Sequence, residues 1–284
     1  MKSIEKYIEK HNRIINSELK KYFKSYRPLS KLLTEAMSYT LFSAGKRLRP
    51  ILTLAVCDAL DREHKLIMPA ALAVEMIHNF SLIHDDLPCM DNDDIRRGKP
   101  TSHKVFGEAV ALLAGDALLT EAFKVITKCA KYPELKNENI VKAVSELAFL
   151  SGSGGMTAGQ VLDITTDKHR FSLDMIKKIH YCKTGALIEA SCRLPALILG
   201  ASESQFKSIN IYAKNIGLVY QIIDDLLDNS QNSDEFNFIR FYGKSKALKL
   251  SRELTEEAVD KLKIFSNKGK YLKDIALFLL NRKK

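Results

Sequence analysis

Residues 70–91 read AALAVEMIHNFSLIHDDLPCMD, an apolar stretch that ends in carboxylates. The apolar side chains before Asp85 recur at the three- and four-residue spacing of a helix, and Pro88 then interrupts the helical hydrogen bonds. Asp85, Asp86 and Asp91 therefore follow directly on a helical segment. Two like charges about 4 Å apart repel by about 4 kcal/mol at an effective dielectric of about 20, so a bound cation would stabilise this cluster.

The ligand type indicates which cation this would be. Carboxylate oxygens without a histidine or cysteine partner favour Mg²⁺, which keeps waters and shares the phosphate oxygens of a substrate. Asp85 and Asp91 do not share a helix face, but the break at Pro88 can bring Asp91 back toward the same ion. The alternatives are a solvated acidic loop and a calcium loop that starts at Asp91. The calcium loop fails because Ile95 and Arg96 stand where a carboxylate and the turn glycine are required.

A second acidic cluster lies at the end of an apolar helical segment, residues 211–227. Asp224, Asp225 and Asp228 are spaced to share adjoining parts of one helix face, with Gln221 one turn earlier. They have no basic partner at i+4 and repel one another, which favours metal binding over a merely solvated face. Two such helices facing each other would hold several Mg²⁺ ions.

Two basic segments accompany the carboxylates. Arg96 and Arg97 follow the first cluster, and residues 45–50 read GKRLRP ahead of an apolar helix. Guanidinium groups bind phosphate bidentately, although each segment alone is typical of an ordinary surface patch. Carboxylates for a metal together with cations for phosphate predict a magnesium diphosphate substrate, for bond formation or for hydrolysis.

The bulk composition sets the class of protein. With 284 residues, 46% of them apolar, the chain can bury a sizeable core. Its formal net charge of +10 attracts anions such as nucleic acid, anionic lipid or diphosphates. Five cysteines without a C-x-x-C pair argue against a disulfide framework or a zinc ribbon. Since neither a secretory signal nor a membrane span is evident, we expect a soluble, cytoplasmic protein.

Helical spacing recurs along nearly the whole chain, while alternating strand patterns are scarce. Chain breakers divide it into eight to ten helices, at Tyr26 to Pro28, around Pro69, at Arg97 to Pro100, at Tyr132-Pro133 and across Ser151 to Gly155. We therefore predict an all-α fold with a single domain over residues 1–284.

Two further segments have a structural and a functional interpretation. Residues 151–155, SGSGG, lack the G-K-[ST] ending of a phosphate-binding loop, so we interpret them as a hinge between helices. The N-terminal helix carries an apolar stripe among Lys and Glu residues and could lie on a membrane surface. We expect it to pack against the domain instead.

Residues 83–101, IHDDLPCMDNDDIRRGKPT, resemble the first Asp-rich motif of the short-chain trans-prenyl diphosphate synthases, in particular bacterial and plastid-type farnesyl and geranylgeranyl diphosphate synthases. Other segments follow in the family's order: GKRLRP at 45–50, VEMIH at 74–78, LAGD at 113–116, Gly159-Gln160 with Asp163, KTG at 183–185, and Gln221 leading into DDLLD at 224–228. The resemblance covers about residues 40 to 230. It implies an isoprenoid synthase helical bundle with a central substrate cavity and, in this family, a homodimer.

The resemblance also implies a role for each matching residue. Asp85, Asp86, Asp91, Asp224 and Asp228 would bind the Mg²⁺ ions, and the neighbouring Asp225 is a sixth candidate ligand. The allylic diphosphate would contact Arg96, Lys183 and Gln221, and isopentenyl diphosphate would contact Lys46, Arg49, His78 and Arg97. The candidate catalytic residues are Asp85, Asp86, Arg96, Lys183, Thr184 and Gln221. Metal-assisted departure of diphosphate would leave an allylic cation in a dry pocket, isopentenyl diphosphate would attack it, and the released diphosphate would take the proton.

One part of the family's pattern is altered. A G-K-x-x-G-x-D segment and then K-x-T-x-P are expected after the second motif, whereas residues 234–250 read DEFNFIRFYGKSKALKL. Lys244 and Lys246 are the candidates to replace the expected lysines. Since this segment normally closes over the allylic diphosphate, the change predicts lower activity or dependence on a partner.

Product length is predicted from Phe80, the fifth residue before Asp85, which lies about 7.5 Å lower at a rise of about 1.5 Å per residue. An aromatic ring there would form the floor of the tail pocket. With Ser81 beside it and the Pro88-Cys89 insertion in the motif, we expect farnesyl diphosphate, made from dimethylallyl or geranyl diphosphate. Geranylgeranyl diphosphate is the alternative product.

Three other functions compete with the synthase. A terpene cyclase would carry an N-S-E-type triad where Asp224 stands, and DDLLD argues against it. A low-activity or non-catalytic regulatory subunit of a prenyl diphosphate synthase is supported only by the altered residues 234–250. Nucleic-acid binding lacks a helix-turn-helix, a zinc site or stacking aromatics, so we expect no nucleic-acid partner.

Overall fold

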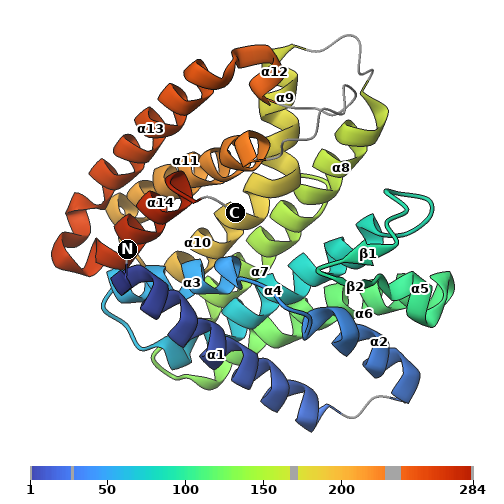
Figure 1. The fold of residues 1–284 in the computed structure, drawn as a ribbon. Helices are drawn as coiled ribbons and strands as arrows, with labels where there is room; N and C mark the ends of the chain where they lie inside the picture. Colours follow the sequence, from blue (N-terminus) through green and yellow to red (C-terminus); the bar gives the residue numbers. More distant parts are fainter. Residues whose placement is uncertain (1, 27–28, 167–171, 228–237, 283–284) are drawn as a thin grey trace.

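The stretch that ends in Asp85 forms α4 (His64–Asp85), which packs against α3 (Leu48–Ala59), α6 (Glu108–Ile126) and α10 (Ala186–Ile198) (Figure 1). Its side chains are buried on all sides, as in the run from Ala70 to Ile77. A helix that is apolar all round is stable only inside a core. The structure is a computed structural model that describes residues 2–26, 29–166, 172–227 and 238–282.

The other elements surround these helices (Figure 1). They are α1 (Lys2–Ser25), α2 (Lys31–Leu41), α5 (Ser102–Phe106), α7 (Asn137–Ser151), α8 (Met156–Thr165), α9 (Leu173–His180), α11 (Glu203–Leu227), α12 (Phe238–Tyr242), α13 (Lys244–Lys261) and α14 (Lys270–Leu280), with 3₁₀ segments η1 (Thr127–Lys131) and η3 (Leu262–Gly269), a π-helical turn η2 (Tyr181–Gly185), and a hairpin of β1 (Ile95–Arg96) and β2 (Lys99–Pro100). The predicted all-α class is confirmed. That residues 1–284 form one domain stays a prediction.

Two details of the predicted helix pattern are wrong. No break occurs at Pro69, because α4 begins at His64 and continues through the proline. The described residues also form fourteen α-helices rather than eight to ten. The C-terminal helical stretch, for example, is divided at η3, where Ser266 has a φ of 50°, and two of the fourteen helices have only five residues.

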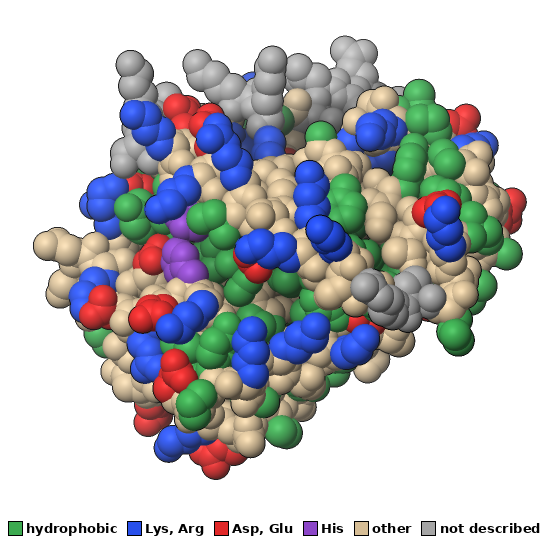
Figure 2. All heavy atoms as spheres, turned by 90° about the horizontal axis from the view of Figure 1, so that it is seen from below, with side chains coloured by type: hydrophobic (Ala, Val, Ile, Leu, Met, Phe, Trp, Pro, Cys, Tyr) green, Lys and Arg blue, Asp and Glu red, His purple; other side chains and the backbone are tan. Residues whose placement is uncertain are grey.

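The N-terminal helix and the glycine-rich segment take the structural roles expected of them. Ile4, Tyr7, Ile15 and Leu19 of α1 are buried in the main apolar core, so α1 packs against the bundle. The segment from Gly152 to Gly155 is a turn between α7 and α8. Basic side chains are spread over the face seen from below (Figure 2). Within the described ranges, no helix is long and apolar enough to cross a membrane.

A buried ion pair fixes the GKRLRP segment. Arg47 precedes α3 with a left-handed φ of 52°, and its guanidinium donates to Glu75 Oε1 of α4 at 2.5 Å and to the Leu41 carbonyl at 2.6 Å. Both charged side chains are only 2% exposed. Arg47 therefore anchors the segment, while its neighbours Lys46 and Arg49 line a pocket.

This pair gives a stability prediction. Glu75→Gln leaves the buried Arg47 charge without a counterion, so it should lower the free energy of unfolding by about 3–5 kcal/mol. Glu63→Gln removes an exposed glutamate that pairs with Lys65 and should leave the free energy of unfolding nearly unchanged. Urea unfolding of the three proteins measures both effects. Equal losses in the two variants would contradict the anchoring role of Arg47.

Candidate active site

The first Asp-rich motif turns back on itself at the end of α4. Asp85 is the last residue of the helix, and the Asp91 amide donates to the Asp85 carbonyl at 2.9 Å. The chain therefore reverses between them, in the exposed segment that contains Pro88 and Cys89. The backbone of Asp91 therefore returns to Asp85, and the binding of one ion by both carboxylates stays a prediction.

The pKa of Asp85 is raised to about 6, first by burial and then by the nearby Asp91 and Asp86 carboxylates. Lys183 and Arg96 act in the opposite direction because their positive charges favour the carboxylate. A buried carboxylate whose pKa is raised in this way gains stability when a cation binds beside it. The environment of Asp85 therefore suits a metal ligand.

Asp86 is paired with Arg96 rather than facing the tail pocket. Its carboxylate is buried and forms an ion pair with Arg96, which also donates to Asp93 Oδ2 at 3.0 Å. Burial raises the pKa of Asp86, and the hydrogen bond from Arg96 opposes that shift. In this structure Asp86 and Arg96 therefore hold the β1–β2 hairpin against the end of α4.

The hairpin turn aims Arg97 into a second pocket. Arg97 and Gly98 form a two-residue turn between β1 and β2 with φ of 54° and 75°, as a type I′ turn requires. The Arg97 guanidinium donates to Ser43 Oγ at 3.1 Å and lies 3.4 Å from His78 Nε2. The two neighbouring arginines thus have separate tasks: Arg96 binds the motif and Arg97 lines the pocket.

Lys183 is brought to the acidic motif by the π-helical turn η2. Its ammonium donates to Asp163 Oδ2 of α8 at 2.5 Å. Burial opposes its charge, but Asp163, and then Asp85 and Asp91, raise the pKa of Lys183. A side chain at Gly159 would collide with the backbone of η2 at Lys183, which explains a glycine there. Thr184 is half-buried in the same turn.

The second Asp-rich motif is described only in part. Asp224 forms an ion pair with Arg282, and its pKa is raised by burial, while Arg282 opposes the shift. Asp225 accepts from the Phe238 amide at 2.7 Å and from Gln221 Nε2 at 3.2 Å, so it caps α12. The predicted ligand Asp228 lies outside the described residues.

Lys46, Arg49, His78 and Arg97, predicted to bind one diphosphate, line a single cavity of about 750 Å³. We call it the basic pocket. It also contains Asp224, Tyr220 and Arg282, so it joins residues of both motifs. Burial and the surrounding arginines hold the pKa of His78 well below its usual range.

The basic pocket has hydrogen-bonding capacity that the described residues do not satisfy. Arg49 Nε and Arg282 Nε are buried without an acceptor among the described residues, and an unsatisfied buried donor costs about 1–3 kcal/mol. An anion with several oxygens would satisfy both. The basic pocket therefore suits a diphosphate.

Arg282 is a site residue that sequence reasoning missed. In the sequence it follows α14 and is distant from both motifs. In the structure it stacks on Tyr220, with 4.2 Å between its guanidinium carbon and the ring centroid. It also donates to the Tyr220 carbonyl at 2.8 Å. In the sequence it belongs to a basic C-terminal run, NRKK, which gives no signal for a contact with Asp224.

A smaller cavity of about 280 Å³ lies beneath the first motif, between Asp85, Lys183 and Phe80. We call it the tail pocket. Phe80 meets His84 edge to face at 4.9 Å between ring centroids, and His84 Nε2 lies 3.0 Å from the Leu112 carbonyl of α6. A side chain at Gly115 would collide with this ring, so the glycine lets His84 form one wall.

The altered segment after the second motif is described from Phe238 onward. It forms α12 and the start of α13, held on α11 by the buried Phe238 ring. Lys244 and Lys246, the candidates to replace the family's lysines, are exposed on α13. Neither of them lines the basic pocket or the tail pocket.

The donor set fits magnesium in kind. Among the described residues, no three acidic, histidine or cysteine side chains converge closely enough to hold a metal ion by themselves. Mg²⁺ is usually held by one or two carboxylates together with waters and substrate phosphates. Asp85 and Asp91 near one cavity, and Asp224 in the other, provide carboxylates for such shared coordination.

Comparisons with known proteins agree over most of the chain. The sequence pattern of the polyprenyl synthetase family matches residues 30–239. The chloroplastic heterodimeric geranylgeranyl pyrophosphate synthase large subunit 1 of Arabidopsis thaliana is 42% identical over 272 residues, which cover 90% of this chain and 73% of that protein. The geranylgeranyl diphosphate synthase of Cyanophora paradoxa is 38% identical over 97% of this chain and 95% of its own length. A solved geranyltransferase structure from Legionella pneumophila has a TM-score of 0.91 at 33% identity, covering 99% of this chain and 98% of that one.

The environment of Asp85 gives a pH-dependent stability prediction for the metal-free protein. The pKa of Asp85 is about 6 in the folded chain and about 3.9 in an unfolded one. Below pH 4 the Asp85 carboxyl is protonated in both the folded and the unfolded chain, so it does not affect the free energy of unfolding. As the pH rises through 6, the unfolded chain is already ionised and the folded chain must ionise a buried group, so Asp85 lowers the free energy of unfolding. After allowance for partial exposure, Asp85→Asn should stabilise the protein by about 2 kcal/mol at pH 8.

Denaturant unfolding in EDTA at pH 4.5 and pH 8 measures this difference. Asp94→Asn is the control, because Asp94 is an exposed carboxylate of the same loop that pairs with Lys104. It should leave the stability nearly unchanged at either pH. A gain for Asp85→Asn that is the same at both pH values would contradict the assigned cause.

Proposed function

Because this chain belongs to the polyprenyl synthetase family, we propose that it condenses isopentenyl diphosphate with an allylic diphosphate in a Mg²⁺-dependent reaction. The resemblance to short-chain prenyl diphosphate synthases and the isoprenoid synthase fold are confirmed. The chain is a trans-prenyltransferase by family. A divalent metal is general in this family, and the choice of Mg²⁺ rests on the carboxylate donors.

The observation that carries the proposal is the basic pocket. It is lined by Lys46, Arg49, Arg97 and Arg282, and it includes Asp224 of the second motif. The Nε donors of Arg49 and Arg282 are buried and lack acceptors among the described residues. A hydrolase of a single diphosphate needs one phosphate site. A separate cationic pocket beside a carboxylate site suits two diphosphate substrates, of which only one requires a metal.

We assign the basic pocket to isopentenyl diphosphate. Lys46, Arg49 and Arg97 would bind its diphosphate, with charge-assisted hydrogen bonds that are stronger than neutral ones. His78, whose pKa is lowered by burial and by the surrounding arginines, would hold the Arg97 guanidinium in place. Arg282 extends this set beyond the residues expected from the sequence.

We assign the acidic motifs and the tail pocket to the allylic diphosphate. Asp85, Asp91, Asp224 and Asp228 would hold Mg²⁺ ions, which neutralise the charge of the departing diphosphate. Asp86 and Asp225, also predicted as ligands, have other partners here, and we propose that they position Arg96 and α12. Gln221 would help to hold Asp225 there through its hydrogen bond.

The side chains would then have limited chemical tasks. Lys183, held by Asp163, would contact the allylic diphosphate and keep positive charge near the oxygen that leaves. Thr184 and Gln221 would shield the allylic cation electrostatically. The tail pocket would keep water away from it, and the released diphosphate would accept the proton that isopentenyl diphosphate loses after the new carbon–carbon bond forms.

We propose farnesyl diphosphate as the main product, from dimethylallyl or geranyl diphosphate, with geranylgeranyl diphosphate as the alternative. Phe80 and His84 lie where they would limit the tail. The relatives' names, geranylgeranyl diphosphate synthase among them, support the longer product as well. The regulatory-subunit alternative is not favoured, because the described motif residues are those of an active site.

We propose a cytoplasmic homodimer. The homodimer rests on the family resemblance, and α6 and α7 expose Leu113, Val141 and Phe149, apolar surface that a second subunit would cover. One relative is named as the large subunit of a heterodimeric, chloroplastic enzyme. The identity of the partner subunit and the cellular compartment are therefore proposed independently of the active-site residues.

The activity has a direct test. Purified protein with Mg²⁺, isopentenyl diphosphate and each allylic primer in turn should give prenyl diphosphates resolved by chain length. Asp85→Ala and Asp224→Ala should each lower kcat at least a hundredfold, whereas Asp94→Ala, in the same loop as Asp85, should stay within twofold. Full activity in either of the first two variants would refute the metal assignment, and no product with any primer would refute the function.

Product length has its own test. Phe80→Ala enlarges the tail pocket, so the product should lengthen by at least one five-carbon unit. Ile264→Ala is the control, since it removes an exposed apolar side chain outside that pocket, and its product should match that of the unaltered protein. An unchanged chain length in Phe80→Ala would show that the ring does not limit the tail.

A further inference from the structure

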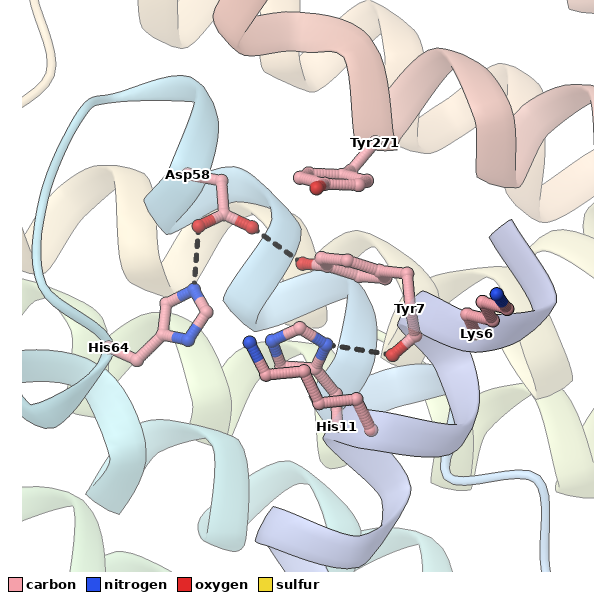
Figure 3. Close-up of a pocket in the computed structure, with 7 residues that line it drawn as sticks. Lys6, Tyr7, His11, Asp58, His64 and Tyr271 are labelled. Carbon is pink, nitrogen blue, oxygen red and sulfur yellow. Dashed lines mark hydrogen bonds and ion pairs between the residues drawn. The ribbon is translucent and has the colours of Figure 1, made fainter. Parts of the chain in front are cut away.

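A third cavity, of about 590 Å³, lies at the far end of α3 from the basic pocket. It is lined by Lys6, Tyr7, Lys10 and His11 of α1, by Asp58 and His64, and by Tyr271 of α14. Figure 3 shows Tyr7 and His11 facing Asp58 and His64 across it. None of these residues belongs to the motifs of the proposed active site, so this cavity is distinct from both pockets of that site.

The single acid of this cavity is already satisfied by its neighbours. Asp58 accepts from the Tyr7 hydroxyl at 2.6 Å and from His64 Nε2 at 2.7 Å (Figure 3). These hydrogen bonds hold the pKa of Asp58 below its usual range although burial opposes the shift. Each carboxylate oxygen thus accepts one hydrogen bond, and the ion pair that Asp58 forms is with His64 rather than with a lysine.

The cations of the cavity lack such partners. Lys6 and Lys10 are one helical turn apart, which puts them on the same face of α1. Within the described ranges, neither ammonium has an ion-pair partner. Both lysines are exposed, so their ammonium groups, with the single Asp58 carboxylate, give the lining a net positive charge that attracts anions.

The two histidines each keep one ring nitrogen for a ligand. His11 Nδ1 lies 2.8 Å from the Tyr7 carbonyl and must donate to it, because a carbonyl only accepts. Burial, helped by His64 and Lys10, lowers the pKa of His11, so its Nε2 is an acceptor at neutral pH. His64 donates through Nε2 to Asp58 and keeps Nδ1.

Two ammonium donors beside an imidazole acceptor match an anion that carries both oxygens and an acidic hydroxyl. Phosphate monoanions and dianions have this character near neutral pH, since their second pKa is about 6. Metal binding is disfavoured, because the two ammonium groups would repel a cation. We propose that this cavity is a binding site for a small phosphorylated anion, with Lys6 and Lys10 on its oxygens and His11 Nε2 accepting its hydroxyl.

The volume fits that class. Ligand pockets typically measure about 300–1,000 Å³, so the cavity has room for a phosphate or diphosphate group and a small organic part. An anion held here would join α1 to α3 and α14. Ligand binding to the folded state would therefore raise the stability of the protein.

The test follows the histidine ring signals by NMR at constant pH and ionic strength without added metal. Titration with inorganic phosphate should shift the His11 and His64 signals saturably, and inorganic diphosphate should do so at lower concentration. Lys6→Gln/Lys10→Gln should weaken this binding at least tenfold. Lys20→Gln/Lys21→Gln makes the same change of charge elsewhere on α1, on exposed lysines, and should leave the binding within twofold.

Sulfate separates the role of His11 from simple charge attraction, because at neutral pH it has no acidic hydroxyl. It should bind several times more weakly than phosphate. Equal binding of the two anions, equal binding by the two double variants, or no shift of His11 and His64 would overturn the proposal. The His78 signal reports the basic pocket in the same experiment, so the result is independent of the proposed prenyltransferase activity.

Discussion

Mutual repulsion between the aspartates at the ends of α4 and α11 is the constraint on which the candidate active site depends. Three of the described members have a cation beside them: Lys183 near Asp85, Arg96 on Asp86, and Arg282 on Asp224. Without such neighbours, buried carboxylates at one end of a bundle would not stay ionised. The metal-free protein thus uses its own basic side chains where the proposed reaction would place magnesium ions and diphosphates.

Irregular backbone positions several of the cations in and around the site. Lys183 lies in a π-helical turn, and such turns are frequent at functional sites. Arg97 has a left-handed conformation in the hairpin turn, and Arg47 has one before α3. Residues held in sparsely populated conformations persist only where their surroundings fix them, as Glu75 does for Arg47. The regular helices supply the rigid frame, and these few positions aim the charges.

The helical class and most of the site could be predicted because they depend on local pattern and on segment order. The periodic apolar runs gave the long helices, and the segments GKRLRP and IHDDLPCMD identified the basic pocket and the first motif. The helix through Pro69 could not be predicted, because core packing of α4 outweighs the lost hydrogen bond there. Arg282 could not be found either, because its contact with Asp224 exists only after α14 folds back on α11.

The choice between adjacent carboxylates also lies beyond the sequence. Asp85 and Asp86 are neighbours in one motif, yet one lines the tail pocket and the other binds Arg96. Asp224 and Asp225 divide in the same way, between the basic pocket and α12. In each pair the direction of the side chain is decided by where the helix ends and by what packs against it. Sequence spacing alone predicts that all four of these aspartates bind the metal.

The most direct measurement is a crystal structure of the protein with Mg²⁺, isopentenyl diphosphate and an unreactive thio analogue of an allylic diphosphate. The account predicts metal ions bound by Asp85, Asp91 and Asp224 with the analogue's diphosphate, and isopentenyl diphosphate on Lys46, Arg49 and Arg97. In that structure Asp86 should remain on Arg96, and Asp224 should have exchanged Arg282 for metal. Both diphosphates in one pocket, or metal ions on Asp86 and Asp225 instead, would contradict it.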